Sequence, residues 1–303
     1  MAVEIEVEGT QRLGWGQWLR ARPRVQGFLL VLPALIWMLL LLIIPLVLTV
    51  ITSFGRRDPD GNVIYTFTLE NYLRLLGLTP EGFDPLYARI LWRSVVLAFW
   101  TTLLVILLAY PLAYFIARAP VKRRSLYTFM VLVPLWTNFV IRIYAWVMIL
   151  RNQGVLNSTL GWAAGLLGIP FTAPNWLGSS DFSKWSVVIL TLWKNSGFTM
   201  VVYLAALQGV PQELYDAAQT DGANSWNRFR HVTVPMISPT TFFLFIFQTI
   251  GAFQLFTEPY VMTQGGPANS SLSVVMYIYY AAFRDTRMDK ASAMAWFLFL
   301  IIF

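Results

Sequence analysis

The sequence predicts an all-α integral membrane protein with six spanning helices. Hydrophobic residues make up 57% of the 303 residues, charged residues only 12%, and the mean hydropathy is +0.60. Soluble globular domains are seldom this apolar. A helix needs about 20 mostly apolar residues to cross roughly 30 Å of hydrocarbon, because its backbone polar groups must be satisfied within the segment. Five stretches reach that length, and a sixth begins near the end of the chain.

The spans are expected, in order, at residues 27–49, 94–117, 126–150, 185–206, 240–262 and 291–303. The first is longer than the apolar core of a secretory signal, about 7–15 residues, and ends in SFGRRDPD rather than at a small-residue cleavage site. We therefore expect it to be retained as a span. The last apolar run, AMAWFLFLIIF, is shorter than a full span, so we expect the sixth helix to be cut short at Phe303.

The distribution of basic residues predicts the orientation. The loop RAPVKRR, residues 118–124, holds four bases and no acid, and the N-terminal tail holds four more at Arg12, Arg20, Arg22 and Arg24. Short loops rich in Lys and Arg stay in the cytoplasm. In the loop 50–93, Arg56, Arg57, Arg74 and Arg89 are offset by five acids. Alternation of the spans then places 213–235 in the cytoplasm, and 50–93, 151–184 and the region after 262 outside, as loops with short surface helices.

The cytoplasmic stretch ELYDAAQTDGANSWNRFRHVTVP is expected to form a helix, a tight turn and a second helix. Pro211 suits a first helical turn, and the acids Glu213 and Asp216 complement the positive end of the helix dipole. Gly222 tolerates the left-handed backbone conformation that ends a helix. A second helix should begin at Asn224 or Ser225 and run to Pro235, where the next span starts.

The spacing within this stretch resembles a known signature. Asp216-Ala217-Ala218, three residues, Gly222, nine residues and then Val232-x-Val234-Pro235 is similar to the EAA motif of permease subunits of ABC importers, with Asp for the first Glu and Val for Ile and Leu. The resemblance implies a type I importer permease with a coupling helix that docks in a cleft of a separate ATPase. The residues it assigns to coupling are Glu213, Asp216, Ala217, Ala218, Gly222 and Pro235. An ordinary amphipathic helix on the membrane surface is the alternative.

The resemblance extends over residues 27–303, but the two halves of the chain differ. The part from residue 154 on resembles carbohydrate and glycerol-phosphate permeases, whereas residues 67–150 resemble spermidine and putrescine permeases. The sugar-permease resemblance implies that five residues line the substrate pathway, namely Asn195, Gly197, Met200, Phe253 and Gln254. Amides and aromatic rings suit a sugar site. The alternative is that such polar residues only bridge neighbouring helices.

Three charged residues lie within the predicted spans: Arg142, Lys194 and Glu258. Each costs about 2.5–3.5 kcal/mol at a helix centre on insertion scales, and so needs a partner or a wet cavity. Glu258 joins the pathway candidates. Two bases and one carboxylate disfavour a polycation as cargo and could suit a phosphorylated sugar. Arg142 and Lys194 could instead extend to the outer surface.

These features predict a division of labour between subunits. The chain has no cysteine, a single histidine and no G-x-x-x-x-G-K-[ST] phosphate loop, so we expect no metal or other cofactor, no ATP hydrolysis and no nucleic-acid partner. We expect a cytoplasmic tail at 1–26 and a permease domain at 27–303 that contains the coupling loop 208–237. Its partners in the bacterial inner membrane would be a second permease, two ATPase subunits that hold ATP and Mg, and an extracytoplasmic binding protein.

The predicted function is import of a sugar or related polar solute. The alternatives are a polyamine importer permease and a stand-alone secondary transporter. The latter would show inverted repeats, and none is evident. A membrane enzyme is disfavoured because no cluster of nucleophilic or acid–base residues stands out in the sequence.

Overall fold

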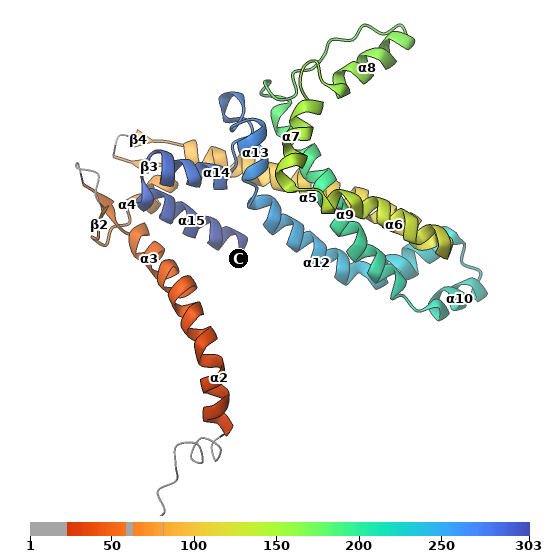
Figure 1. Ribbon diagram of the computed structural model, residues 1–303, viewed down its shortest axis with the longest axis horizontal. Coiled ribbons are helices and arrows are strands. Elements are labelled where there is room, and N and C mark those ends of the chain that lie inside the picture. The colour runs from red at the N-terminus through yellow and green to blue at the C-terminus, as the bar shows by residue number, and fades with distance from the viewer. Residues whose placement is uncertain (1–22, 59–62, 81) are drawn as a thin grey trace, which may run out of the picture.

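The computed structural model describes residues 23–58, 63–80 and 82–303 (Figure 1). Most of the predicted tail, with Arg12, Arg20 and Arg22, lies outside these residues, as do Asp60 and Glu81. The described chain is mainly helical, which confirms the predicted fold class. Two short antiparallel pairs lie between the first two long helices: β1 (Arg56–Arg57) with β2 (Val63–Ile64), and β3 (Leu78–Thr79) with β4 (Gly82–Phe83).

The first span is a continuous helix built from α2 (Pro23–Met38), the π-helical turn η1 (Leu39–Ile43) and α3 (Ile44–Ser53). Of its described side chains only Ser53, at its end, is buried. Its α3 part packs against the last helix, α15, whereas α2 extends away from the rest of the chain (Figure 1). A helix apolar on all sides and unburied within its own chain requires lipid or a second protein around it.

Three helices form the central bundle: α5 (Leu86–Arg118), α9 (Ser183–Gln208) and α12 (Val234–Phe253). Small side chains at Ala109 and Ala113, four residues apart on α5, are fully buried against Met200 and Tyr203 of α9. Small residues let helix backbones approach closely, which is how spanning helices associate without a hydrophobic driving force.

The third predicted span, 126–150, is not a single straight helix. The segment is two helices, α6 (Val121–Trp136) and α7 (Phe139–Ile149), bent by 94° at the break. Pro134 lies in the last turn of α6, where its ring removes a backbone donor. Asn138 then caps the new helix, because its side-chain oxygen accepts from the backbone N–H groups of Val140 and Ile141.

The fifth predicted span, 240–262, is also wrong at both ends. The helix α12 begins at Val234, as a continuation of α11 (Ser225–Arg228) and the π-helical turn η2 (Phe229–Thr233), and it ends at Phe253. Residues 257–262 form a separate short helix, α13 (Thr257–Met262). Gln254 therefore caps α12, and Glu258 lies on α13 rather than within a spanning helix.

A second packed region lies apart from the central bundle. Its elements are α4 (Glu70–Leu75), α14 (Val274–Tyr279), η4 (Tyr280–Arg284) and α15 (Met288–Ile302), and the short turn η3 (Pro267–Asn269) precedes α14. Buried side chains from α4, α5, α14 and α15 meet there at Leu75, Ile90, Met276 and Met294. The region after residue 262, expected as surface loops with short helices, is thus largely packed into the fold.

The described residues contain four helices long and apolar enough to cross a membrane, or five if α6 and α7 count as one broken span. The sixth predicted span corresponds to α15, which is only 15 residues long. The loop before α6 follows the C-terminal end of α5. The segment that carries α10 (Gln212–Thr220) follows the C-terminal end of α9. The helix α10 follows the C-terminal end of α9, whereas α8 (Val155–Leu166) precedes its N-terminal end. The two short helices therefore lie at opposite ends of the bundle (Figure 1).

Candidate functional site

The predicted helix–turn–helix at 213–235 is confirmed. Pro211 is the N-cap of α10, and Glu213 lies in its first turn. The helix ends in a Schellman motif: the Ala223 N–H donates to the Ala218 carbonyl at 2.9 Å, and the Gly222 N–H donates to the Gln219 carbonyl at 3.0 Å. Gly222 has a φ of +79°, which L side chains rarely adopt, so the turn depends on glycine at this position.

The outward face of α10 is open. Glu213, Asp216 and Ala217 are exposed, and Leu214 is 39% exposed. Leu214 and Ala217 are three residues apart and so lie on the same side of the helix. The Asp216 carboxylate accepts a hydrogen bond from the Gln212 side chain at 3.1 Å. An exposed helix with a small apolar stripe and acids at its N-terminal half is a surface that another protein could cover.

The inward face of α10 is tied to the start of α12. The Tyr215 hydroxyl lies 3.0 Å from the Thr233 hydroxyl, and Thr233 is fully buried in the π-helical turn η2. Arg228 donates to the Gln219 side chain at 3.2 Å, which connects α11 to α10. The Phe229 ring contacts Tyr114 of α5 at a centroid distance of 5.2 Å. Displacement of α10 would therefore act on both α12 and α5.

Pro235 lies exposed in the first turn of α12, within the continuous helix that starts at Ser225. The preceding turn is π-helical, and the Val234 N–H donates to the Phe229 carbonyl five residues earlier. The helix–turn–helix is thus joined to the spanning part of α12 without a flexible loop.

A polar network connects α9 and α12 inside the bundle. The Asn195 amide donates to the Gln248 side-chain oxygen at 3.0 Å, and the Gln248 amide donates to the Thr199 hydroxyl at 2.7 Å. Gln248 and Thr199 are buried, whereas Asn195 is half-buried. Sequence reasoning selected Asn195 but missed Gln248, although an amide within FLFIFQTI is a visible signal for a buried polar contact.

The structure does not bring the other pathway candidates together around Asn195. Gly197 faces α6, since a Cβ atom there would lie 2.9 Å from the Val131 carbonyl oxygen. Met200 is fully buried in the bundle core, and Phe253 is half-buried between two hydrophobic clusters. Gln254 is exposed at the end of α12.

The charged residues of the predicted spans have partners. Lys194 of α9 forms an ion pair with Glu258 of α13, whose side chain is only 4% exposed. Arg142 donates to the Thr137 carbonyl at 2.7 Å, so its charge neutralises the carbonyl end of α6 at the break. The alternative that both bases extend to the surface does not hold, because Arg142 is 7% exposed and Lys194 is paired.

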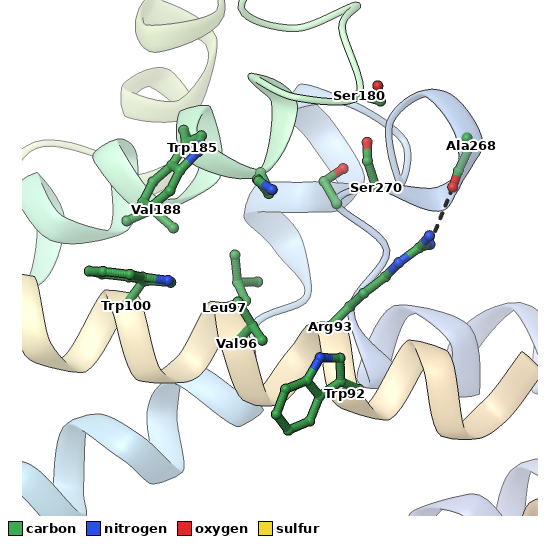
Figure 2. A pocket seen from close by; sticks show the side chains of 12 residues that line it. Trp92, Arg93, Val96, Leu97, Trp100, Ser180, Trp185, Val188, Ala268 and Ser270 are labelled. Atoms are coloured by element: carbon green, nitrogen blue, oxygen red, sulfur yellow. Dashed lines mark hydrogen bonds between the residues drawn. The ribbon is translucent and has the colours of Figure 1, made fainter.

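A groove of about 370 Å³ lies at the other end of the bundle, between the N-terminal parts of α5 and α9 and the segment 268–271 (Figure 2). Three tryptophans line it, Trp92, Trp100 and Trp185. Arg93 donates to the Ala268 and Asn269 carbonyls at 3.2 and 2.7 Å, which fixes this segment against α5. Tryptophan is enriched at membrane–water boundaries, and a cluster of three at one end of the spanning helices is consistent with that preference.

Several spanning helices and a helix–turn–helix joined rigidly to one of them define a multi-pass membrane protein of the transport-permease class. Residues 109–303 match the family described as binding-protein-dependent transport system inner membrane component, and the chain belongs to that family. It is a permease subunit of an ABC importer, as the register from Asp216 to Pro235 predicts. Among the described residues, no three His, Cys, Asp or Glu side chains form a group that could hold a metal ion.

Individual relatives support the same class. The chain is 32% identical to the lactose transport system permease protein LacF of Rhizobium radiobacter, over 86% of this chain and 84% of the relative. It is 30% identical to the sulfoquinovosyl glycerol permease SmoG of Agrobacterium fabrum, over 98% and 93%. It is also 30% identical to the spermidine/putrescine permease PotB of Escherichia coli, over 85% and 87%.

The fold has a solved counterpart. A chain of a bacterial ABC transporter involved in the import of the acidic polysaccharide alginate superposes with a TM-score of 0.77 at 23% identity, covering 94% of this chain and 93% of that one. A second structure of the alginate transporter, in complex with an alginate pentasaccharide-bound periplasmic protein, gives a TM-score of 0.78 at 21% identity, covering 94% and 92%. At these identities the likeness establishes the fold.

Proposed function

We propose that this chain is one of two permease subunits of an ATP-driven importer of saccharides, with its N-terminus in the cytoplasm of a bacterium. ATP and Mg bind to two separate ATPase subunits, and an extracytoplasmic binding protein delivers the cargo. The observation that carries the proposal is the exposed face of α10, together with its fixed connection to α12 through Tyr215 and Thr233. In this role, Glu213, Asp216, Ala217, Ala218 and Gly222 form the docking surface, and Pro235 begins the span that moves.

The names of relatives and the charges in the pathway both bear on the identity of the cargo. LacF is named as a lactose permease and SmoG as a sulfoquinovosyl glycerol permease. The ion pair between Lys194 and Glu258 leaves the pathway without a free base there, so the structure gives no support to an anionic cargo. The amide network of Asn195 and Gln248 offers neutral donors and acceptors, which suit hydroxyl groups. A neutral, polar saccharide is the cargo that these side chains favour.

The relative PotB favours a second candidate, a polyamine. A polycation requires carboxylates along its route. The helices α5, α6, α7, α9 and α12 contain no Asp or Glu, and Glu258 at their edge is already paired. This absence of negative charge favours the saccharide.

The cargo can be tested on the cognate binding protein. Thermal-shift screening against neutral saccharides, glycerol phosphates and polyamines should yield a saccharide as the stabilising ligand, and uptake of that saccharide into proteoliposomes should require all subunits and ATP. Spermidine as the sole binder would overturn the saccharide assignment. Uptake by the purified chain alone would indicate a stand-alone secondary transporter.

The orientation can be tested because the chain has no cysteine. Lys122→Cys, at the start of α6, and Gly165→Cys, in α8, place single thiols at exposed positions on opposite ends of the bundle. A membrane-impermeant maleimide should label Gly165→Cys in intact spheroplasts and Lys122→Cys only after permeabilisation. The reverse pattern would refute a cytoplasmic α10.

A further inference from the structure

A polar cleft of about 430 Å³ lies behind the coupling helix. It is formed by the C-terminal end of α5, the first turn of α6, the end of α9 and the inner faces of α10 and α11. Three arginines line it, Arg118, Arg124 and Arg228, together with Gln208, Gln212 and the two tyrosines Tyr114 and Tyr215. The residues that line it include no acid, so the cleft has a formal charge of three positive units.

The positive charge of the cleft is only partly used within the chain. Arg118 lies 4.3 Å from the ring centroid of Tyr114. Arg124 donates to the Ala117 carbonyl at 2.7 Å, and Arg228 donates to Gln219 and to Ser225. None of the three forms an ion pair with a described residue, and the Nε groups of Arg124 and Arg228 are buried without a hydrogen-bond partner.

Helix dipoles do not cancel this charge. The C-terminal ends of α5 and α9 contribute about half a negative charge each, and the N-terminal ends of α6 and α10 contribute a similar positive amount. The Asp216 carboxylate, on the exposed face of α10, is bound to Gln212. Three guanidinium groups line one cleft without a carboxylate partner among the described residues, so an anion with several acceptor oxygens would balance their charge.

The position of the cleft, at the ends of spanning helices, indicates the source of the anion. Two spanning helices, α5 and α9, end at its wall, at Arg118 and Gln208, and α6 begins there. This is the level at which phospholipid headgroups lie, and basic pockets between spanning helices on the cytoplasmic side bind anionic headgroups. We propose that the cleft binds the phosphate of an anionic phospholipid of the inner leaflet.

The position of this site gives the lipid a consequence for coupling. Arg118 and Arg124 belong to the spanning helices, whereas Arg228 and Tyr215 belong to the helix–turn–helix. A phosphate that accepts from both sets joins the coupling helix to α5 and α6. The headgroup thereby stiffens the connection through which α10 moves the spans. The inference rests on the proposed cytoplasmic placement of α10.

The test measures lipid retention by the purified complete transporter, without cargo or ATP, so that it does not depend on the saccharide or on coupling. Wild type, Arg118→Gln and Arg228→Gln are compared in nanodiscs of phosphatidylcholine with a minor fraction of phosphatidylglycerol, and bound lipid is counted by native mass spectrometry after release. Each cleft variant should retain phosphatidylglycerol about five-fold more weakly. Lys122→Gln and Arg123→Gln are the matched controls, because both side chains are exposed in the same loop and lie outside the cleft lining.

Equal loss in the control and cleft variants, or no loss in either, would overturn the proposal. Displacement of the lipid by inorganic phosphate alone would also overturn it, and would assign the cleft to a soluble phosphate. A melting temperature unchanged from wild type shows that a variant is folded, and Arg118→Lys, which retains the charge, should preserve most of the binding. If α10 has no coupling role, variants of its exposed face will have the uptake and ATPase activity of wild type, whereas lipid retention by the cleft can still be detected. The coupling proposal and the lipid proposal can therefore fail independently.

Discussion

Gly222 provides the sharpest test of coupling, because the structure separates its conformational role from a steric one. Its φ is +79°, and a Cβ atom built there would meet nothing within 4 Å. A Cβ atom at this position therefore meets no steric obstacle among the described residues. A β-branched residue in the left-handed region costs about 1–2 kcal/mol, whereas asparagine tolerates it. Gly222→Val should thus reduce the population of the native turn about 5- to 30-fold, and Gly222→Asn should leave it nearly intact.

The assay is the ratio of cargo imported to ATP hydrolysed in proteoliposomes that contain the complete transporter. Gly222→Val should lower this ratio without changing the melting temperature of the complex, because the turn is exposed and no buried contact depends on it. Gly222→Asn is the matched control and should behave as wild type. A ratio equal to that of wild type in both the valine and the asparagine variant would refute the reasoning that the positive φ matters. Equal loss in both would instead show that the ATPase approaches the backbone too closely for any side chain.

Three further perturbations test the bundle. Lys194→Met should lower the free energy of unfolding by about 2–4 kcal/mol because it leaves Glu258 buried without a partner, whereas the double change with Glu258→Gln should recover most of the loss in a thermal-shift assay. Gln248→Leu removes the oxygen that accepts from Asn195 and the amide that donates to Thr199. If these groups bind cargo, the loss of about 1–3 kcal/mol of binding free energy should raise the KM for uptake correspondingly. A lowered melting temperature with unchanged KM would show that Gln248 only bridges helices. Gly197→Ala forces a Cβ atom to 2.9 Å from the Val131 carbonyl and should destabilise the complex by about 1–3 kcal/mol, whereas Gly165→Ala, with open space around it, should be neutral or slightly stabilising.

The local parts of the fold could be predicted because the residues that determine them are close in sequence. The turn at Gly222 and the cap at Asn224 need only neighbouring backbone groups, so propensity and capping rules locate them, whereas Pro211, expected in the first helical turn, is the N-cap. The sequence prediction did not include the break at 136–139, because composition indicates whether a segment is apolar and does not show where the helix axis changes direction. The signal was present in Pro134 and in Asn138, a capping residue inside an apolar run.

The contacts of the candidate pathway could not be predicted in the same way. Lys194 and Glu258 are 64 residues apart, and their pairing depends on where α12 ends and how α13 packs back on α9. The role of Gly197 depends likewise on the position of α6. Which side of a helix faces a neighbour is set by tertiary packing, so sequence resemblance could suggest that these positions matter without showing what each one touches.

Two prolines show how the spans remain continuous where sequence rules expect a break. Pro45 and Pro235 each lie in a long helix, at the second position after a π-helical turn. A proline in an α-helix interior lacks a donor and its ring clashes with the carbonyl four residues earlier. In both places the residue before the proline donates to the carbonyl five residues back instead, Ile44 to Leu39 and Val234 to Phe229, and the wider turn relieves the clash. Pro235 therefore does not separate the helix–turn–helix from its span. It follows a widened turn at the joint, where the buried Thr233 contacts Tyr215, so α10 is attached to an unbroken helix that leads into the span.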